Sequence, residues 1–185
     1  MYGLVNKAVE GLITSKFGEE TWENIKADAG VDVDIFISNE SYPDDITYKL
    51  AIAASERLNM PLGDILKALG HYWVTHVAEK HYGAMMVAGG STFQEFIANL
   101  PNFHRRVRMI FPDLEPPVFT VRTSSEHSLE LIYESTREGL EDFVIGLLQG
   151  LGDRYKVNIH IQSEPIEAPV QSSIITMVLF KIYWS

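Results

Sequence analysis

Apolar residues recur at every third or fourth position along the first part of the chain, with polar residues between them. A repeat of this kind places the apolar side chains on one face of an α-helix, which then packs against a core. The predicted helices cover residues 2–16, 19–28, 44–58 and 61–81, and a further one carries Phe93 to Phe111. Polar residues, glycine and proline at 30–43 predict a connecting loop.

From Pro112 onward the repeat changes, and apolar residues occupy every second position. Side chains alternate between the two faces of a β-strand, so this spacing is typical of strands with one buried face. Strands are predicted at 118–122, 128–137, 155–163 and 172–184, and a helix over 138–151 ends at Gly152. The order of elements predicts an α+β fold in one domain, residues 1–185. A helical lobe of about residues 1–60 precedes a lobe of about 61–185 that holds a four-stranded antiparallel sheet and helices.

Composition narrows the classes of function. The chain has no cysteine, which excludes disulfides, iron–sulfur clusters and thiolate-ligated metals, so any metal must rest on His, Met, Tyr or carboxylate. Its net charge of −10 repels phosphate backbones, and only Arg105, Arg106 and Arg108 form a short basic cluster, so no nucleic acid partner is expected. No apolar run approaches the roughly 20 residues that span a bilayer, and no signal peptide is evident, so we expect a cytoplasmic protein without membrane association.

Most of the histidines fit ordinary structural positions. His71, His76 and His81 are five residues apart, and at about 100° per residue on an α-helix they point in different directions. They are therefore expected at the surface or at helix boundaries rather than around one metal. His127 lies in a polar turn and His160 on the polar side of a strand, so solvent exposure explains both.

His104 differs because it lies inside the apolar stripe of its helix. It follows Leu100 by four residues and Ile97 by seven, so its ring is expected to point inward. An inward histidine is more often a hydrogen-bonded core residue than a metal ligand, and the stripe alone leaves both interpretations open. Pro101 is expected to kink this helix because it lacks a backbone N–H.

The helix that carries His104 should begin at a capping-box pattern, Ser91 with Gln94.

A second candidate for binding chemistry lies in the segment Tyr133-Glu134-Ser135-Thr136-Arg137. Every second side chain of a strand emerges on one face, so Tyr133, Ser135 and Arg137 should converge. Together they form a donor cluster suited to one or two carboxylates. The alternative is a solvated strand face whose arginine pairs with neighbouring glutamates.

Taken together, these residues resemble a known family. The Tyr-x-Ser-x-Arg motif at 133–137, the inward His104 that precedes it by 29 residues, and Pro116-Pro117 between them are similar to the haem nitric oxide/oxygen binding (H-NOX) family. This family is related to the haem domain of soluble guanylate cyclase. The segments MYGLVNKA, DDITYKLAIAASERL, HYWVTH and GLLQGLG resemble its cyanobacterial members, so the likeness extends along essentially the whole chain.

The resemblance implies a haem b cofactor buried between the two lobes. His104 would be the fifth ligand of the iron, Pro117 would press on the porphyrin and distort it, and the propionates would be held by the donor cluster. The residues implied in holding the propionates are Tyr133, Ser135 and Arg137, and those implied on the distal face are Val5, Trp73, Val77, Phe143 and Leu147.

The resemblance also implies a gas sensor rather than an enzyme. We expect it to bind nitric oxide and carbon monoxide but not to hold oxygen stably, because Phe143 stands where oxygen-binding members carry tyrosine. Binding of nitric oxide would weaken the bond from iron to His104 and shift the two lobes. The output is expected to come from a separate polypeptide, a histidine kinase or a cyclic-di-GMP enzyme, since no output segment is evident here. The alternatives are a haem-free scaffold or apolar-ligand module, and a haem enzyme, which would need a polar distal acid or base.

Overall fold

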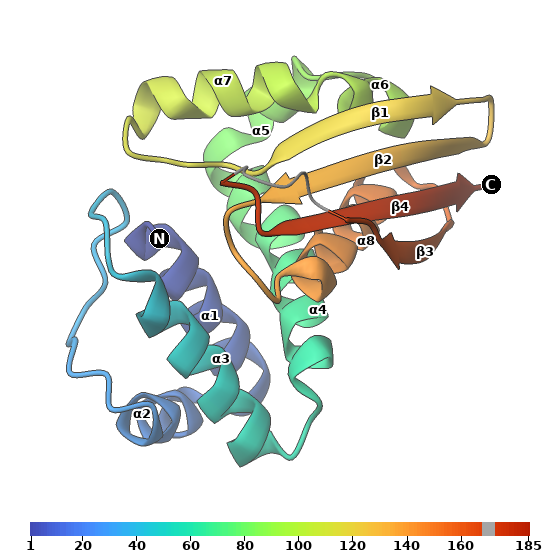
Figure 1. Ribbon diagram of the computed structural model, residues 1–185. Helices are drawn as coiled ribbons and strands as arrows, with labels where there is room; N and C mark the ends of the chain where they lie inside the picture. The colour runs from blue at the N-terminus through green and yellow to red at the C-terminus, as the bar shows by residue number, and fades with distance from the viewer. Residues whose placement is uncertain (168–172) are drawn as a thin grey trace.

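The computed structural model describes residues 1–167 and 173–185 and places a group of helices beside a twisted sheet (Figure 1). The elements are α1 (Gly3–Phe17), α2 (Glu19–Asp28), α3 (Asp44–Leu58), α4 (Leu62–Tyr72), η1 (Trp73–Ala78), α5 (Glu79–Val87), α6 (Phe93–Ala98), α7 (Leu100–Ile110), β1 (Val118–Ser124), β2 (Ser128–Ser135), α8 (Glu141–Tyr155), β3 (Ile159–Pro165) and β4 (Thr176–Trp184). We call α1, α2 and α3 the helical lobe and the elements from α4 onward the sheet lobe. This arrangement confirms the predicted α+β fold.

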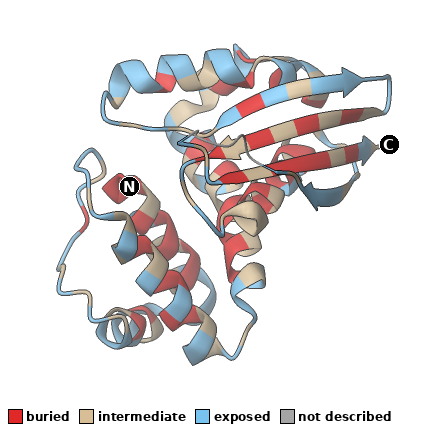
Figure 2. Ribbon diagram, viewed as in Figure 1, coloured by how far each residue is buried: buried red, intermediate tan, exposed pale blue. Residues whose placement is uncertain are grey.

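Two apolar clusters form the interior. The first joins α1, α2 and α3 around fully buried side chains such as Trp22, Ile25 and Leu50, and it also takes in Ile65 of α4. The second lies between the sheet and the helices α6 and α8, with Phe180 at no measurable exposure. Figure 2 shows the buried positions on the inner sides of α1 and α3 and along β2 and β4. Helix α4 belongs to the first cluster and packs closely against α8, which belongs to the second, so this contact joins the two lobes.

The sheet has four strands in the order β1-β2-β4-β3, all antiparallel, as predicted. In β2 the side chains alternate, with Leu129, Leu131, Tyr133 and Ser135 buried. The strand ends at Ser135 rather than at 137, because its last ladder partner on β4 is Thr176. Arg137 therefore lies in the turn that follows the strand.

The predicted end of α8 at Gly152 was wrong, and with it the start of the following strand. The helix continues to Tyr155, and Lys156 ends it in the left-handed conformation. A Cβ at Gly152 would lie 3.1 Å from the carbonyl oxygen of Val157, so this glycine allows the returning chain to pack closely. Strand β3 then begins only at Ile159.

Two predicted long helices are each interrupted. The segment expected as one helix over 61–81 contains the π-helical turn η1 between α4 and α5. The helix expected to carry Phe93 to Phe111 divides into α6 and α7, and Pro101 lies in the first turn of α7, where its missing N–H costs little. It begins a new helix instead of kinking a continuous one. The N-cap of α6 is Thr92, whose hydroxyl accepts from the N–H of Glu95. This cap lies one residue later than the pair predicted from the sequence.

Helices α4 and α8 cross at two glycines. A Cβ at Gly70 would lie 2.2 Å from the carbonyl oxygen of Phe143, and one at Gly146 would lie 2.1 Å from that of Lys67. The backbones can approach this closely only because both side chains are absent. This crossing brings Trp73, at the end of α4, next to Phe143 of α8 on the wall of the cavity described below.

We predict that Gly146→Ala destabilises the fold by about 1–3 kcal/mol, since the added methyl group forces the two backbones apart. The measurement is the urea concentration at the midpoint of unfolding. Gly83→Ala in α5 is the matched control, because its Cβ would have no neighbour closer than 3.6 Å. That variant should be as stable as the parent or about 1 kcal/mol more stable through helix propensity. Equal midpoints for Gly146→Ala and the parent would contradict the close-packing interpretation.

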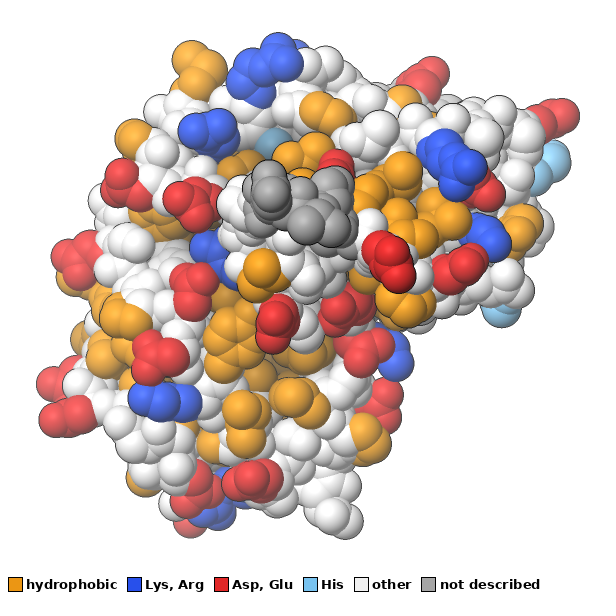
Figure 3. All heavy atoms as spheres, viewed as in Figure 1, with side chains coloured by type: hydrophobic (Ala, Val, Ile, Leu, Met, Phe, Trp, Pro, Cys, Tyr) orange, Lys and Arg blue, Asp and Glu red, His pale blue; other side chains and the backbone are white. Residues whose placement is uncertain are grey.

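The surface agrees with the acidic composition. Figure 3 shows carboxylates scattered over both lobes on the face drawn, in line with the net charge of −10. Over residues 1–167 and 173–185, none of the helices has both the length and the apolar character that crossing a membrane requires.

Candidate functional site

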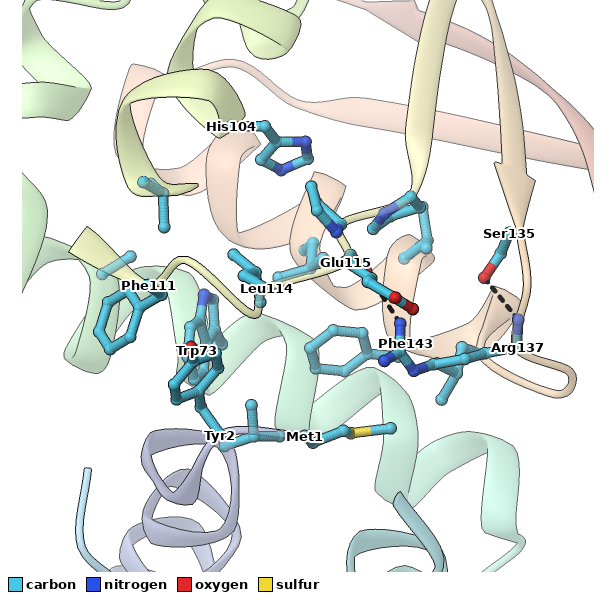
Figure 4. Close-up of a pocket in the computed structure, with 18 of the residues that line it drawn as sticks. Met1, Tyr2, Trp73, His104, Phe111, Leu114, Glu115, Ser135, Arg137 and Phe143 are labelled. Atoms are coloured by element: carbon cyan, nitrogen blue, oxygen red, sulfur yellow. Dashed lines mark hydrogen bonds between the residues drawn. The ribbon is translucent and has the colours of Figure 1, made fainter. Parts of the chain in front are cut away.

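A cavity lies between the helical lobe and the sheet lobe (Figure 4). Its volume of ≈ 240 Å³ far exceeds that of a single water molecule, about 30 Å³, so it has room for a larger ligand. The lining is mostly apolar and comes from the N-terminal segment, α1, η1, α5, α7, the loop before β1, the strands β1 and β2, and α8. Of the residues predicted for the site, the cavity brings together His104, Pro117, Tyr133, Ser135, Arg137, Val5, Trp73, Phe143 and Leu147.

His104 projects from α7 into this cavity and is only partly exposed. Burial lowers the pKa of His104 to about 4, while a hydrogen bond with the backbone of Pro117 acts in the opposite direction. Proline has no N–H, so the ring donates to the Pro117 carbonyl oxygen. The imidazole is therefore neutral near pH 7, with one nitrogen occupied as a donor and the other left with a lone pair. This is the state and the orientation in which histidine binds a metal.

The donor cluster predicted from the sequence forms at the rim of the cavity. Tyr133 is almost fully buried, which raises its pKa, and its hydroxyl is hydrogen-bonded to the Ser135 side chain. The Ser135 hydroxyl oxygen accepts from the backbone N–H of Arg137 at 2.9 Å (Figure 4). Strand alternation aligns Tyr133 with Ser135, as predicted, whereas the turn after β2 brings in Arg137.

The guanidinium of Arg137 joins three parts of the chain. Its Nε donates to Asp44 at the start of α3, at 2.6 Å, and Nη1 donates to the carbonyl oxygen of Glu115 at 2.9 Å. Asp44 also accepts from the N-terminal ammonium of Met1. Burial alone would raise the pKa of Asp44, but the hydrogen bonds from the ammonium and from Arg137 outweigh it and hold the pKa below its usual value. The rim is thus a charged contact between the two lobes.

Tyr2 connects the N-terminal segment with the end of α7. It is buried, its ring packs edge-on against Phe111 with centroids 4.8 Å apart, and its hydroxyl accepts from the N–H of Asp113 at 3.1 Å. Sequence analysis missed both Tyr2 and Asp44. The only local signal was the acidic first turn of α3, which was interpreted as a helix start.

The wall opposite His104 is apolar and includes Val5, Phe143 and Leu147. Trp73 begins the π-helical turn η1 and lines the same wall, and its indole N–H has no hydrogen-bond partner among residues 1–167 and 173–185. Val77 does not line this cavity; it packs against the helical lobe and lines a second cavity on the other side of α1.

A family model described as "Haem-NO-binding" matches residues 2–163, and the chain belongs to this family. It is also similar to three animal guanylate cyclases. The match is 27% identical to soluble guanylate cyclase gcy-31 and 30% to gcy-37, both of Caenorhabditis elegans, over 90% and 80% of this chain. For soluble guanylate cyclase 89Db of Drosophila melanogaster the identity is 23% over 79% of the chain. The chain spans less than a quarter of the length of these relatives, 24%, 22% and 22%.

Solved structures support the same fold. An H-NOX protein from S. oneidensis in the Fe(II)NO ligation state superposes with a TM-score of 0.86 at 19% identity, covering 100% of this chain and 99% of that one. The Fe(II) unliganded H-NOX protein from K. algicida gives 0.85 at 24% identity, covering 100% and 97%. The resemblance inferred from the sequence is therefore confirmed, and so is the haem b cofactor at the level of the family. Domains of this family are sensor modules without catalytic activity of their own.

Proposed function

We propose that this chain is a ferrous-haem sensor that binds nitric oxide and carbon monoxide and signals to a separate protein. The observation that carries the proposal is the neutral imidazole of His104, oriented by Pro117 and facing an apolar cavity with a carboxylate-binding rim. An apolar chamber with a nitrogen ligand on one side and hydrogen-bond donors at its edge, one of them the cationic Arg137, suits a porphyrin, which has an apolar ring and two carboxylates. Bound haem would supply an iron centre that binds small gas ligands.

Each group of residues would have a separate task. His104 would bind the iron, and the carbonyl of Pro117 would keep its ring in place. Tyr133, Ser135 and Arg137 would hold the propionates through charge-assisted hydrogen bonds. Arg137 now donates to Asp44, so to bind a propionate it must either hold both carboxylates or leave Asp44. Cofactor binding and the contact between the lobes are therefore connected.

Signalling would use the contacts of α7. His104, which would hold the haem iron, lies on α7, and the far end of this helix is tied to the N-terminal segment through Tyr2 and Phe111. A shift of α7 would therefore reach α1 and change the relative position of the lobes. The domain would act as a two-state element whose populations the bound gas biases.

The test is the absorption spectrum of the reduced, purified protein with and without nitric oxide. We expect a Soret band that shifts when nitric oxide is added and shifts differently with carbon monoxide. A protein that stays colourless when hemin is supplied would refute the proposal and leave a haem-free scaffold or apolar-ligand module. A catalytic haem site is disfavoured because, among the described residues, the wall that includes Val5, Phe143 and Leu147 offers no carboxylate or histidine.

Ligand choice gives a further prediction. A hydrogen-bond donor on the distal wall favours dioxygen far more than nitric oxide. Phe143 has none, and we take Trp73, whose indole N–H is the other donor on this wall, as a packing residue that does not bond to the gas. We expect the reduced parent protein to show no stable oxygen complex in air, whereas Phe143→Tyr should show one, measured by its spectrum and decay rate. Phe143→Leu is the control without a donor and should behave as the parent does. A stable oxygen spectrum in the parent would contradict the assignment.

The partner proposed is a histidine kinase or a cyclic-di-GMP enzyme in the cytoplasm, with the whole chain, residues 1–185, acting as one sensor domain. The exposed side of α7 carries Arg105, Arg106 and Arg108 in contact with solvent. A shift of α7 on gas binding would move these charges, and we propose this side as the surface that changes with ligation. The measurement is the activity of a candidate partner mixed with the haem-loaded protein, with and without nitric oxide.

A further inference from the structure

A second cavity of ≈ 320 Å³ lies between α1 on one side and η1 with α5 on the other. Its polar lining consists of Lys7, Ser38, Tyr72, His76, Lys80 and His81. We propose that this cavity binds a small multivalent anion, such as a phosphate ester or pyrophosphate, that bridges the helical lobe and the sheet lobe. This function is separate from the haem cavity.

The charge of the lining points to an anion. None of the described residues that line the cavity carries a carboxylate, although the chain as a whole has 25 acidic and 15 basic residues. Neither Lys7 nor Lys80 forms an ion pair with any carboxylate in the part of the chain that the structure describes, in contrast to Lys26, Lys49 and Lys67. Glu10 lies close enough to Lys7 for an electrostatic interaction, but it does not line the cavity. Two ammonium groups that face one cavity without a directly paired carboxylate repel each other and favour a bound anion.

The π-helical turn builds the cavity. On a regular α-helix, residues five apart point in different directions, but the i→i+5 pattern of η1 widens the turn. As a result His76 and His81 line the same cavity. His71 does not join them, because its ring is bonded to Asp153 at 2.7 Å. Both histidines are exposed, as the spacing predicted, but the sequence did not show that they share a cavity.

The site is also partly pre-organised. The ring of His76 is stacked on Tyr72 with centroids 4.4 Å apart and planes 9° apart, and its Nδ1 lies 2.8 Å from the Thr75 hydroxyl. A metal ion is a weaker candidate than an anion. Only two histidines are present, and within residues 1–167 and 173–185 no group of three or more His, Cys, Asp or Glu side chains could hold a metal.

The position of the cavity gives a bound anion a means of regulation. Lys7 lies on α1 and Lys80 on α5, so one anion would tie the two lobes together, and Leu4 lines both this cavity and the haem cavity. If the anion and the gas favour different arrangements of the lobes, binding of the anion must change the affinity for the gas. Binding of the gas must then change the affinity for the anion by the same factor. This regulatory part rests on the proposed function, whereas binding of the anion does not.

The first experiment is calorimetric titration of the haem-loaded protein with inorganic pyrophosphate at constant ionic strength. We expect saturable binding that weakens at least about tenfold in Lys7→Gln/Lys80→Gln, because both ammonium groups are lost. Lys16→Gln/Lys156→Gln removes the same charge at two exposed sites outside the cavity and should bind as the parent does. No saturable heat in the parent, or equal weakening in both double variants, would overturn the site.

The second measurement is the carbon monoxide affinity of the same protein with and without pyrophosphate. We expect a shift of at least about twofold in the parent and in Lys16→Gln/Lys156→Gln, and none in Lys7→Gln/Lys80→Gln. An anion that binds in the calorimeter without moving this affinity would overturn the link between the cavities. Failure of the proposed function is recognised separately, because a protein without a Soret band can still be titrated with pyrophosphate.

Discussion

His104→Gly is expected to remove the protein's ligand to the haem iron and to change or abolish the Soret band of the purified protein. The imidazole of His104 is the only histidine ring that lines the haem cavity within the described residues, and its neutral state leaves a nitrogen free for the metal. Glycine leaves a space of imidazole size beside Pro117. Imidazole added to the buffer should enter this space and restore a spectrum close to that of the parent.

The control for this variant is His127→Gly. His127 lies in the exposed turn between β1 and β2, where glycine is readily accommodated, so haem content and spectrum should remain those of the parent. Near-ultraviolet circular dichroism of both variants separates loss of the ligand from loss of the fold. An unchanged Soret band in folded His104→Gly would show that another side chain binds the iron.

The periodicity of the sequence located these residues correctly because it depends only on local geometry. His104 shares an apolar stripe with Leu100, and the helix that carries it needs no information from the rest of the chain to point it inward. Tyr133 and Ser135 share a strand face for the same reason. Arg137 was assigned to the same face by extending the strand too far. It joins the cluster because Ser135 accepts from its backbone N–H.

What the sequence did not show depends on long-range contacts. Asp44 pairs with Arg137 across 93 positions, and Tyr2 accepts from Asp113 across 111. Neither contact leaves a periodic trace, because each partner alone looks like a helix start or a loop residue. The π-helical turn that begins at Trp73 is equally hidden, because no periodic pattern in the sequence marks the change to i→i+5 hydrogen bonds. It decides which residues face each cavity.

Arg137→Gln is expected to accelerate the loss of hemin from the protein by about tenfold to a hundredfold, because one charge-assisted hydrogen bond to a propionate contributes about 1.5–3 kcal/mol. The measurement is the rate of hemin transfer to excess apomyoglobin. Arg122→Gln is the matched control, since Arg122 is exposed on β1 and lies 3.9 Å from Glu130, its one carboxylate partner among the described residues. Its transfer rate should equal that of the parent.

Two further variants separate cofactor binding from the contact between the lobes. Arg137→Lys keeps the charge but loses the planar fork, so its hemin loss should fall between the parent and Arg137→Gln. Asp44→Asn removes the carboxylate that Arg137 binds in the present structure. Because that ion pair is partly exposed, its contribution to the free energy of unfolding is at most about 1 kcal/mol. Asp44→Asn also weakens the contact with the N-terminal ammonium of Met1, so the unfolding midpoint should fall modestly. The same change releases Arg137 to the propionate and should slow hemin loss. If Asp44→Asn instead accelerates hemin loss as much as Arg137→Gln does, the arginine acts on the cofactor through the lobe contact and not through the propionate.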